Sequence, residues 1–103
     1  MLENEIYALL AAPADGETAP RVEHLEHALT SGYARALALE AEGLRLERRI
    51  GEVAADVSAP ERARELVELS ERRSTAQTEH ERLRALLKRL RARTAAARLA
   101  ASV

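Results

Sequence analysis

The sequence has no cysteine, tryptophan or phenylalanine, and Tyr7 and Tyr33 are its only aromatic residues. The lack of cysteine excludes disulfides and thiolate metal sites. The lack of aromatic bulk means that any core must be a narrow seam of Leu, Ile, Val and Ala. No apolar run approaches the length of a membrane span, and the acidic Glu3 and Glu5 precede any base, which argues against a signal peptide. We therefore expect a cytoplasmic protein.

Two apolar stripes run along the remaining chain, and each advances alternately by three and four residues, the spacing of a coiled-coil seam. The first stripe comprises Val22, Leu25, Leu29, Gly32, Ala36, Leu39, Gly43, Leu46, Ile50, Val53 and Val57. The second comprises Leu66, Leu69, Arg73, Ala76, His80, Leu83, Leu87, Leu90, Thr94, Ala97 and Ala101. The break at residues 57–60 is too short to do more than reverse the chain. The sequence therefore predicts a helical hairpin.

These patterns predict an all-α fold: an antiparallel two-helix coiled-coil hairpin with a short N-terminal helix, which we expect to dimerise into a helical bundle. The whole chain, 1–103, is expected to form one helical domain. Its parts are a short amphipathic helix at 2–12, a linker at 13–18, long helices at 19–56 and 60–101, and a turn at 57–59. Thr18 and Ser58 are candidate caps of the long helices, and Glu61 completes a capping box with Ser58.

Folding back at the turn pairs residues whose numbers sum to about 116, and in this register large residues fall opposite small ones. Leu83 falls near Gly32, and Arg73 falls near Gly43. Each glycine lowers helix stability by about 1 kcal/mol relative to alanine, so we interpret both as room for a neighbour, with a hinge or kink at either site as the alternative. The predicted seam consists of Leu25, Leu29, Leu39, Leu46, Ile50, Leu66, Leu69, His80, Leu83, Leu87 and Leu90.

A further apolar set lies outside this seam and would stay exposed in an isolated hairpin. A dimer that forms a four-helix bundle would bury it. We therefore predict a non-enzymatic protein–protein interaction module that forms a homodimer or binds a partner helix. The predicted interface consists of Tyr33, Leu37, Ala41, Leu44, Val67 and Leu86.

Charge is segregated along the chain, with four acids and no base at 1–20 and seven bases and no acid at 82–103. An antiparallel hairpin lays the basic end against Glu17, Glu23 and Glu26, in surface pairs that contribute at most about 1 kcal/mol each. A basic tract of this kind can also serve a membrane or a nucleic acid. Because the net charge is −1 and acidic partners lie within the chain, we expect no nucleic acid and no membrane as partners.

The three histidines form no recognisable catalytic or metal site. His24 and His27 lie on one predicted helical face, but no Glu-x-x-His pair accompanies them, and two histidines leave a metal incompletely coordinated. His80 falls inside the predicted seam, where we expect it to fill space or fix the register. No Ser–His–Asp arrangement, phosphate loop or paired-carboxylate cleft can be assembled. We therefore expect no enzyme activity, metal, cofactor or small-molecule substrate.

Two resemblances offer alternative functions. In its length and its Glu, Leu and Arg content, the hairpin is similar to bacterial secretion and flagellar export chaperones, which implies a role in export. The segment 27–32 (HALTSG) resembles the phosphoacceptor turn of histidine-phosphotransfer domains, which implies a signalling protein. That family has His-x-Leu-Lys-Gly, whereas here Thr30 stands in place of the lysine and the glycine comes one place late.

The expected tip of the hairpin carries three acids, Glu52, Asp56 and Glu61. Coiled-coil hairpins with acidic tips resemble factors that insert into the secondary channel of RNA polymerase, although those factors also have a globular docking domain. As end-of-helix and first-turn residues, Asp56 and Glu61 have a simpler interpretation that needs no partner.

Overall fold

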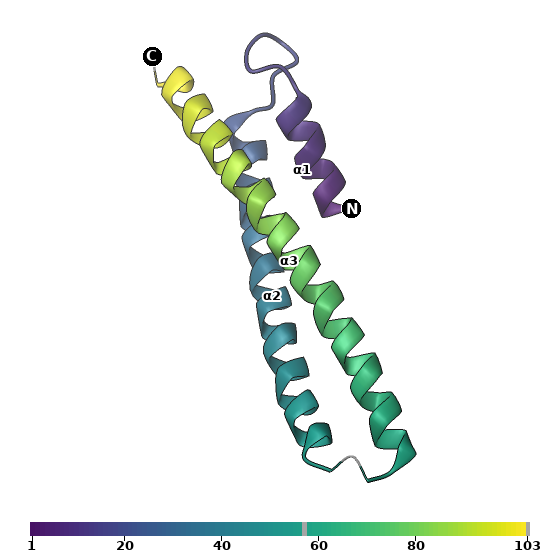
Figure 1. Cartoon of the computed structure of the whole chain (residues 1–103). Coiled ribbons are helices and arrows are strands. Elements are labelled where there is room, and N and C mark those ends of the chain that lie inside the picture. The colour runs from purple at the N-terminus through teal and green to yellow at the C-terminus, as the bar shows by residue number, and fades with distance from the viewer. Residues whose placement is uncertain (57, 103) are drawn as a thin grey trace. The chain divides into compact units, whose positions relative to one another are not determined.

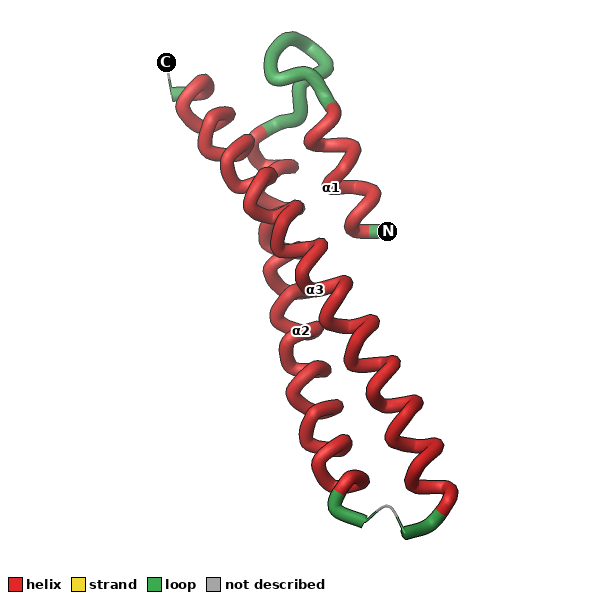
Figure 2. Tube along the Cα trace, viewed as in Figure 1, coloured by secondary structure: helices red, strands yellow, loops and turns green. Residues whose placement is uncertain are grey.

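The computed structural model describes residues 1–56 and 58–102. It confirms the predicted all-α hairpin with a short N-terminal helix. Within the described residues the regular elements are α1 (Leu2–Ala11), α2 (Val22–Ala54) and α3 (Pro60–Ala101). Helices α2 and α3 run antiparallel, and α1 lies beside the first part of α2 and the last part of α3 (Figure 1; Figure 2). Val57, which we placed in the first stripe and in the turn, lies outside the described residues.

Helix α2 begins at Val22, three residues later than predicted. Pro20 accounts for part of the delay, because a proline disfavours helical geometry at the residue before it, here Ala19. The carbonyl of Arg21 accepts the first bonds of the helix, from the backbone N–H groups three and four residues later, at 3.0 and 3.1 Å. Thr18 therefore lies outside the cap position that we expected for it.

Asp56 organises the turn between α2 and α3. Its Oδ1 accepts the Ser58 hydroxyl at 2.7 Å and the Ser58 backbone N–H at 3.4 Å. Both bonds lower the pKa of Asp56 below its ordinary value, and the bond from the Ser58 hydroxyl has the larger effect. The predicted capping box is wrong, because the Ser58 hydroxyl serves Asp56 and α3 begins only at Pro60, a residue well suited to the first helical position.

Two compact units share the long helices. Unit 1 comprises Met1–Ala36 and the chain from Arg82 onward, so it contains α1, the first part of α2 and the last part of α3. Unit 2 comprises Leu37–Glu81 and contains the other parts of α2 and α3. The units therefore differ in the number of helices that contribute buried side chains.

Unit 1 is a three-helix bundle with an apolar interior. Helix α1 contributes Ile6 and Leu9, both of them buried. A Cβ atom added to Gly32 of α2 would lie 3.7 Å from Ile6 Cδ1 and would overlap Cδ2 of Leu87 in α3. The three helices therefore meet closely at Gly32. The other buried residues of α2 and α3 in this unit are Leu25, Ala28, Leu29, Ala36, Leu83, Leu86, Leu90 and Thr94.

The structure corrects two predictions in unit 1. Gly32 does make room for a neighbour, but the neighbour is Leu87, one helical turn beyond the predicted Leu83. Leu86 was expected on an exposed face, and this is wrong because only 4% of it is exposed. A third helix gives α3 a second apolar neighbour, which widens its buried face until adjacent residues are both covered.

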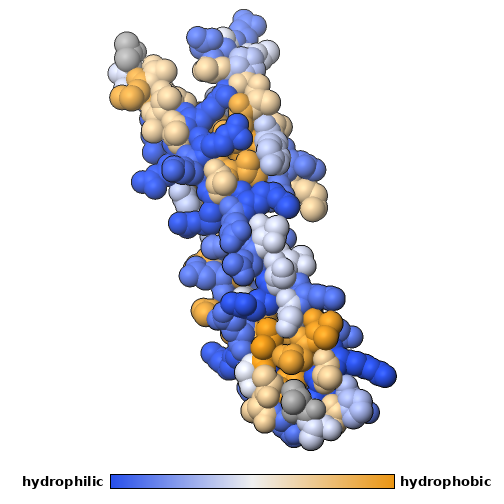
Figure 3. Space-filling view, in the orientation of Figure 1, coloured by the Kyte–Doolittle hydropathy of each residue, from blue (hydrophilic) through white to orange (hydrophobic). Residues whose placement is uncertain are grey.

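Unit 2 has only two helices and a narrower interior. Its buried residues recur every seven positions along each helix, and they are Leu39, Leu46 and Val53 of α2 with Leu69 and Ala76 of α3. Ile50 and Leu66 pack against the cluster nearest the turn but are only partly buried. Figure 3 shows apolar surface at this end of the unit. A seam between two helices thus leaves part of its apolar lining in contact with water.

Candidate interaction site

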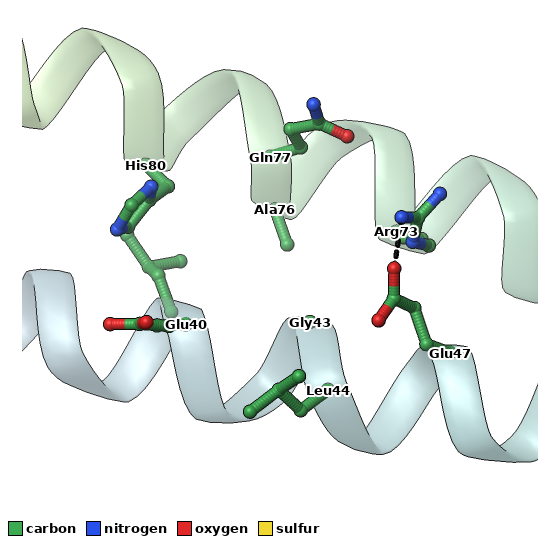
Figure 4. A pocket seen from close by; sticks show the side chains of 9 residues that line it. Glu40, Gly43, Leu44, Glu47, Arg73, Ala76, Gln77 and His80 are labelled. Carbon is green, nitrogen blue, oxygen red and sulfur yellow. Dashed lines mark hydrogen bonds and ion pairs between the residues drawn. The ribbon is translucent and has the colours of Figure 1, made fainter.

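A groove lies between α2 and α3 in unit 2 (Figure 4). Its volume of about 190 Å³ exceeds the roughly 150 Å³ of a protein cavity that holds a benzene molecule. The lining residues are Leu39, Glu40, Gly43, Leu44 and Glu47 of α2 and Arg73, Ala76, Gln77 and His80 of α3. The groove is therefore large enough for one apolar side chain, and polar groups surround it.

The groove is open because three seam positions hold residues that do not fill it. Gly43 has no side chain, and a Cβ atom added there would meet no atom within 4 Å. Arg73 turns toward Glu47 and forms an ion pair with it (Figure 4, dashed line). His80 is half-buried at the edge. Our interpretation that Gly43 is small to admit Arg73 is therefore wrong, although both residues line the same groove.

Closer to the turn, ion pairs join α2 to α3. Arg49 donates two hydrogen bonds to Glu65 Oε1, from Nε at 2.9 Å and from Nη2 at 2.6 Å. It donates a third bond to Glu52 at 3.2 Å, and Arg62 lies 3.6 Å from Glu65. These bonds raise the pKa of Arg49, and the bonds to Glu65 have a larger effect than the bond to Glu52. These side chains are about a third exposed or more, so the network fixes geometry more than it adds stability.

Five of the six predicted interface residues are exposed. Leu37, Leu44 and Val67 of unit 2 are 68%, 59% and 58% exposed, and Tyr33 of unit 1 is 40% exposed. Ala41 is exposed as well. Leu44 both lines the groove and projects into solvent, so unit 2 presents an apolar side chain directly beside an unfilled space.

Eight of the eleven predicted seam residues are buried. The buried ones are Leu25, Leu29, Leu39, Leu46, Leu69, Leu83, Leu87 and Leu90. The three that are only half-buried, Ile50, Leu66 and His80, all belong to unit 2. The seam is therefore least complete in the unit that holds the groove.

Few cations at the C-terminal end of α3 have acidic partners. Arg98 pairs with Glu26 at 3.0 Å, as the antiparallel arrangement predicts, and Arg82 lies 3.8 Å from Glu3. Three acids, Glu17, Glu23 and Glu26, were predicted to pair with the basic tract, and this is confirmed for Glu26 alone. Several charged residues of unit 1 form no ion pair with another residue of 1–56 or 58–102. They include the acids Glu17 and Glu23 and the bases Arg84, Lys88, Arg89 and Arg91.

Arg93 binds the C-terminal end of α1, a role that sequence reasoning missed. Its guanidinium group donates to the carbonyls of Leu10 and Pro13, each at 2.8 Å, and also to the carbonyl of Ala12. A helix end leaves such carbonyls without intrahelical partners, and a cation there complements the helix dipole. The last turn of α1 contains no base of its own, and this was the only signal in the sequence that a cation from elsewhere would be needed.

The remaining candidate residues form no chemical site. His24 lies 3.9 Å from Glu5, and His27 is exposed. In the part of the chain that the structure describes, no three His, Asp or Glu side chains are placed to hold a metal ion. Of the three tip acids, Asp56 is engaged by Ser58 within the turn.

None of the helices in the described residues has the length and apolar character needed to cross a membrane. Comparison of the chain with protein-family models, with curated proteins and with solved structures finds no match. Its function must therefore be inferred from its own residues.

Proposed function

We propose that this chain is a non-enzymatic protein–protein interaction module, a coiled-coil hairpin that self-associates as a homodimer in the cytoplasm. In this proposal unit 2 forms the interface, and the two copies together make a four-helix bundle. The resemblances to export chaperones and to phosphotransfer proteins stay predictions, because no observation on the structure favours either.

The empty space above Gly43 carries the proposal. A glycine inside a helix lowers stability by about 1 kcal/mol relative to alanine, and no neighbouring side chain among the described residues comes within 4 Å of a Cβ added at Gly43. A side chain from a second copy would give the glycine a use, as a knob that enters a hole between helices.

Leu44 is the knob that fits this hole. It lies next to Gly43 in the chain and is 59% exposed, so the projecting side chain lies at the edge of the groove. A two-fold axis near these residues would place each Leu44 in the groove of the other copy, which is the self-complementary arrangement of a symmetric dimer. The ion pair between Arg73 and Glu47, together with Gln77, would form the polar rim around the apolar contact.

The expected dimer is weak. Leu37 and Leu44 are 68% and 59% exposed, and removing these surfaces from water in both copies contributes roughly 4–8 kcal/mol. Association itself costs about 4–15 kcal/mol. Because the contribution of the leucines covers only the lower part of the range of the association cost, other contacts must add to the leucines, and we expect a dimer that depends on protein concentration.

Sedimentation equilibrium of the whole chain over low to high micromolar concentrations tests this proposal. We expect the wild type to shift from 11.3 kDa toward twice that mass. Gly43→Leu fills the groove from within, so it should remain folded and monomeric. Gly51→Leu is the matched control, because Gly51 is also in α2 with no atom near an added Cβ but does not line the groove.

A wild type that stays monomeric at high micromolar concentration would contradict self-association. A Gly43→Leu variant that dimerises as well as the Gly51→Leu control would show that association uses another surface. A variant that dimerises but loses helicity would instead be misfolded. Far-UV circular dichroism on the same samples detects that loss.

A further inference from the structure

Unit 1 contains a second groove, of a different chemical character from the groove in unit 2. Its volume is about 530 Å³, within the range of about 300–1,000 Å³ found for ligand pockets. Tyr33 of α2 forms one side, and five residues of α3 form the rest. Those residues are Arg84, Ala85, Leu87, Lys88 and Arg91.

The three cations of this groove are unused within the chain. Arg84, Lys88 and Arg91 are exposed, and none forms an ion pair or side-chain hydrogen bond with another described residue. Elsewhere on the same stretch of α3, Arg93 and Arg98 are both engaged. Unit 1 holds nine bases and six acids, so it has a net charge of +3, while the whole chain carries −1.

The spacing of these cations places them on one face of α3. Steps of four and three residues bring Arg84, Lys88 and Arg91 to the same side over two helical turns, about 10 Å along the axis. The groove is also lined by the exposed Ala85, by the ring of Tyr33 and by Leu87, of which only 1% is exposed. The groove thus combines a row of positive charges with a short apolar seat.

We propose that this groove binds an acidic amphipathic helix of a partner protein. A helix with carboxylates at steps of four and three residues repeats the spacing of Arg84, Lys88 and Arg91, which is the way in which flanking charges select partners in paired helices. Apolar side chains on the same face of the partner would lie on Ala85 and against the ring of Tyr33, as in other helix-in-groove complexes.

An extended polyanion fits the groove less well. Proteins that bind single-stranded nucleic acid stack successive bases on several aromatic rings, and Tyr33 is the only ring here. A membrane or duplex would also extend beyond the three cations of this groove. A short acidic helix matches the groove better because its charge can be confined to these three cations.

This proposal is independent of self-association, because its residues belong to unit 1 and the Gly43 groove belongs to unit 2. The probe is a fluorescein-labelled peptide of about three heptads, with Leu and Ala on one face and Glu at steps of four and three beside it. A twin peptide carries Gln in place of each Glu. Fluorescence anisotropy measures binding to the whole chain at about 50 and 300 mM salt, a range over which surface charge is progressively screened.

We expect the Glu peptide to bind about tenfold more tightly than its Gln twin at low salt, and to lose that advantage at high salt. The triple variant Arg84→Gln, Lys88→Gln, Arg91→Gln should reduce the affinity for the Glu peptide about tenfold. The matched control is Arg45→Gln, Arg48→Gln, Arg64→Gln, which removes the same charge from exposed positions of unit 2. Tyr33→Ala should weaken both peptides at either salt concentration, because it removes apolar contact. Circular dichroism checks that each variant is folded.

Three results would overturn the proposal. Equal binding of the Glu and Gln peptides would show that the cations select no acidic partner. Equal losses in the two triple variants would show that net charge acts rather than the groove. Tighter binding of a labelled single-stranded RNA or of phosphatidylserine vesicles, lost in the Arg84, Lys88 and Arg91 variant alone, would assign the groove to a polyanion instead of a helix.

Discussion

The two units use the same pair of helices and the same seven-residue repeat, yet they bury different amounts of it. In unit 1, α2 buries the adjacent residues Ala28 and Leu29, and α3 buries the adjacent Leu86 and Leu87. In unit 2, only one residue in seven is fully buried on each helix. The repeat therefore sets which face of a helix is apolar, whereas the number of neighbouring helices sets how much of that face leaves water.

The units also differ in how they use arginine. Unit 2, with a net charge of −4, pairs Arg49 and Arg73 with glutamates of the opposite helix. Unit 1, with a net charge of +3, directs Arg93 to backbone carbonyls at the end of α1. One unit uses arginine to join side chains across a two-helix seam, and the other uses it to fasten a third helix.

Truncating one leucine in each unit tests this difference most strongly. Leu87→Ala removes a side chain that is 1% exposed, so it should reduce the free energy of unfolding by about 2–5 kcal/mol. Leu66→Ala removes a side chain of unit 2 that is only partly buried, so its effect should be clearly smaller. Urea unfolding followed by circular dichroism measures both. Equal losses would mean that the seam of unit 2 is as well packed as the core of unit 1.

Arg93→Gln tests how α1 is held. Charged hydrogen bonds contribute about 1.5–3 kcal/mol in buried settings, and Arg93 is part-buried, so we expect a loss of about 1–2 kcal/mol. Hydrogen exchange should accelerate at the amides of α1 and stay unchanged in residues 37–54. Arg89→Gln is the control, since Arg89 is exposed. If α1 exchanges at the wild-type rate in Arg93→Gln, then Ile6 and Leu9 hold it without the arginine.

Periodicity was sufficient to predict the fold class, because it depends on spacing within one helix. The spacing of Leu25, Leu46, Leu69 and Leu90 identifies buried faces whatever the partner is. The position of α1 was not predictable in this way. Its apolar residues show that it has a face to bury, but only the assembled unit shows that Ile6 lies beside Gly32.

The site was less predictable than the fold, because it depends on how side chains meet between helices. Gly32 and Gly43 are both helical glycines in the same stripe, and the sequence offers no means of telling them apart. In the structure one is pressed against Leu87 and the other faces open space. Similarly, charge counting predicted partners for the basic tract, but ion pairs need side chains within reach, and Glu17 and Glu23 are not paired within the described chain.

A smaller effect is expected from the turn of unit 2. The bonds from Ser58 lower the pKa of Asp56 in the folded chain, so the carboxylate stabilises the fold above the unfolded pKa of about 3.9. That contribution is lost as the pH falls through the lower folded pKa. Asp56→Asn should therefore be slightly less stable than the wild type near neutral pH, with the difference shrinking at low pH. Urea midpoints between about pH 6 and 2.5 measure this, and a difference that grows on acidification would contradict it.

The contrast between close packing at Gly32 in unit 1 and open space at Gly43 in unit 2 is tested most directly by one pair of substitutions, Gly32→Ala and Gly43→Ala. Both add the same methyl group to the same helix, and each gains about 1 kcal/mol of helix propensity. At Gly32 the methyl group overlaps Leu87, and overpacking of about 1–3 kcal/mol should outweigh that gain. At Gly43 no atom lies within 4 Å, so the gain should remain.

Thermal unfolding of the two variants, at a concentration low enough to keep the chain monomeric, gives the result in a single experiment. The account predicts that Tm falls in Gly32→Ala and rises in Gly43→Ala relative to the wild type. A shift of both Tm values in the same direction would contradict it, because the two glycines would then have equivalent surroundings.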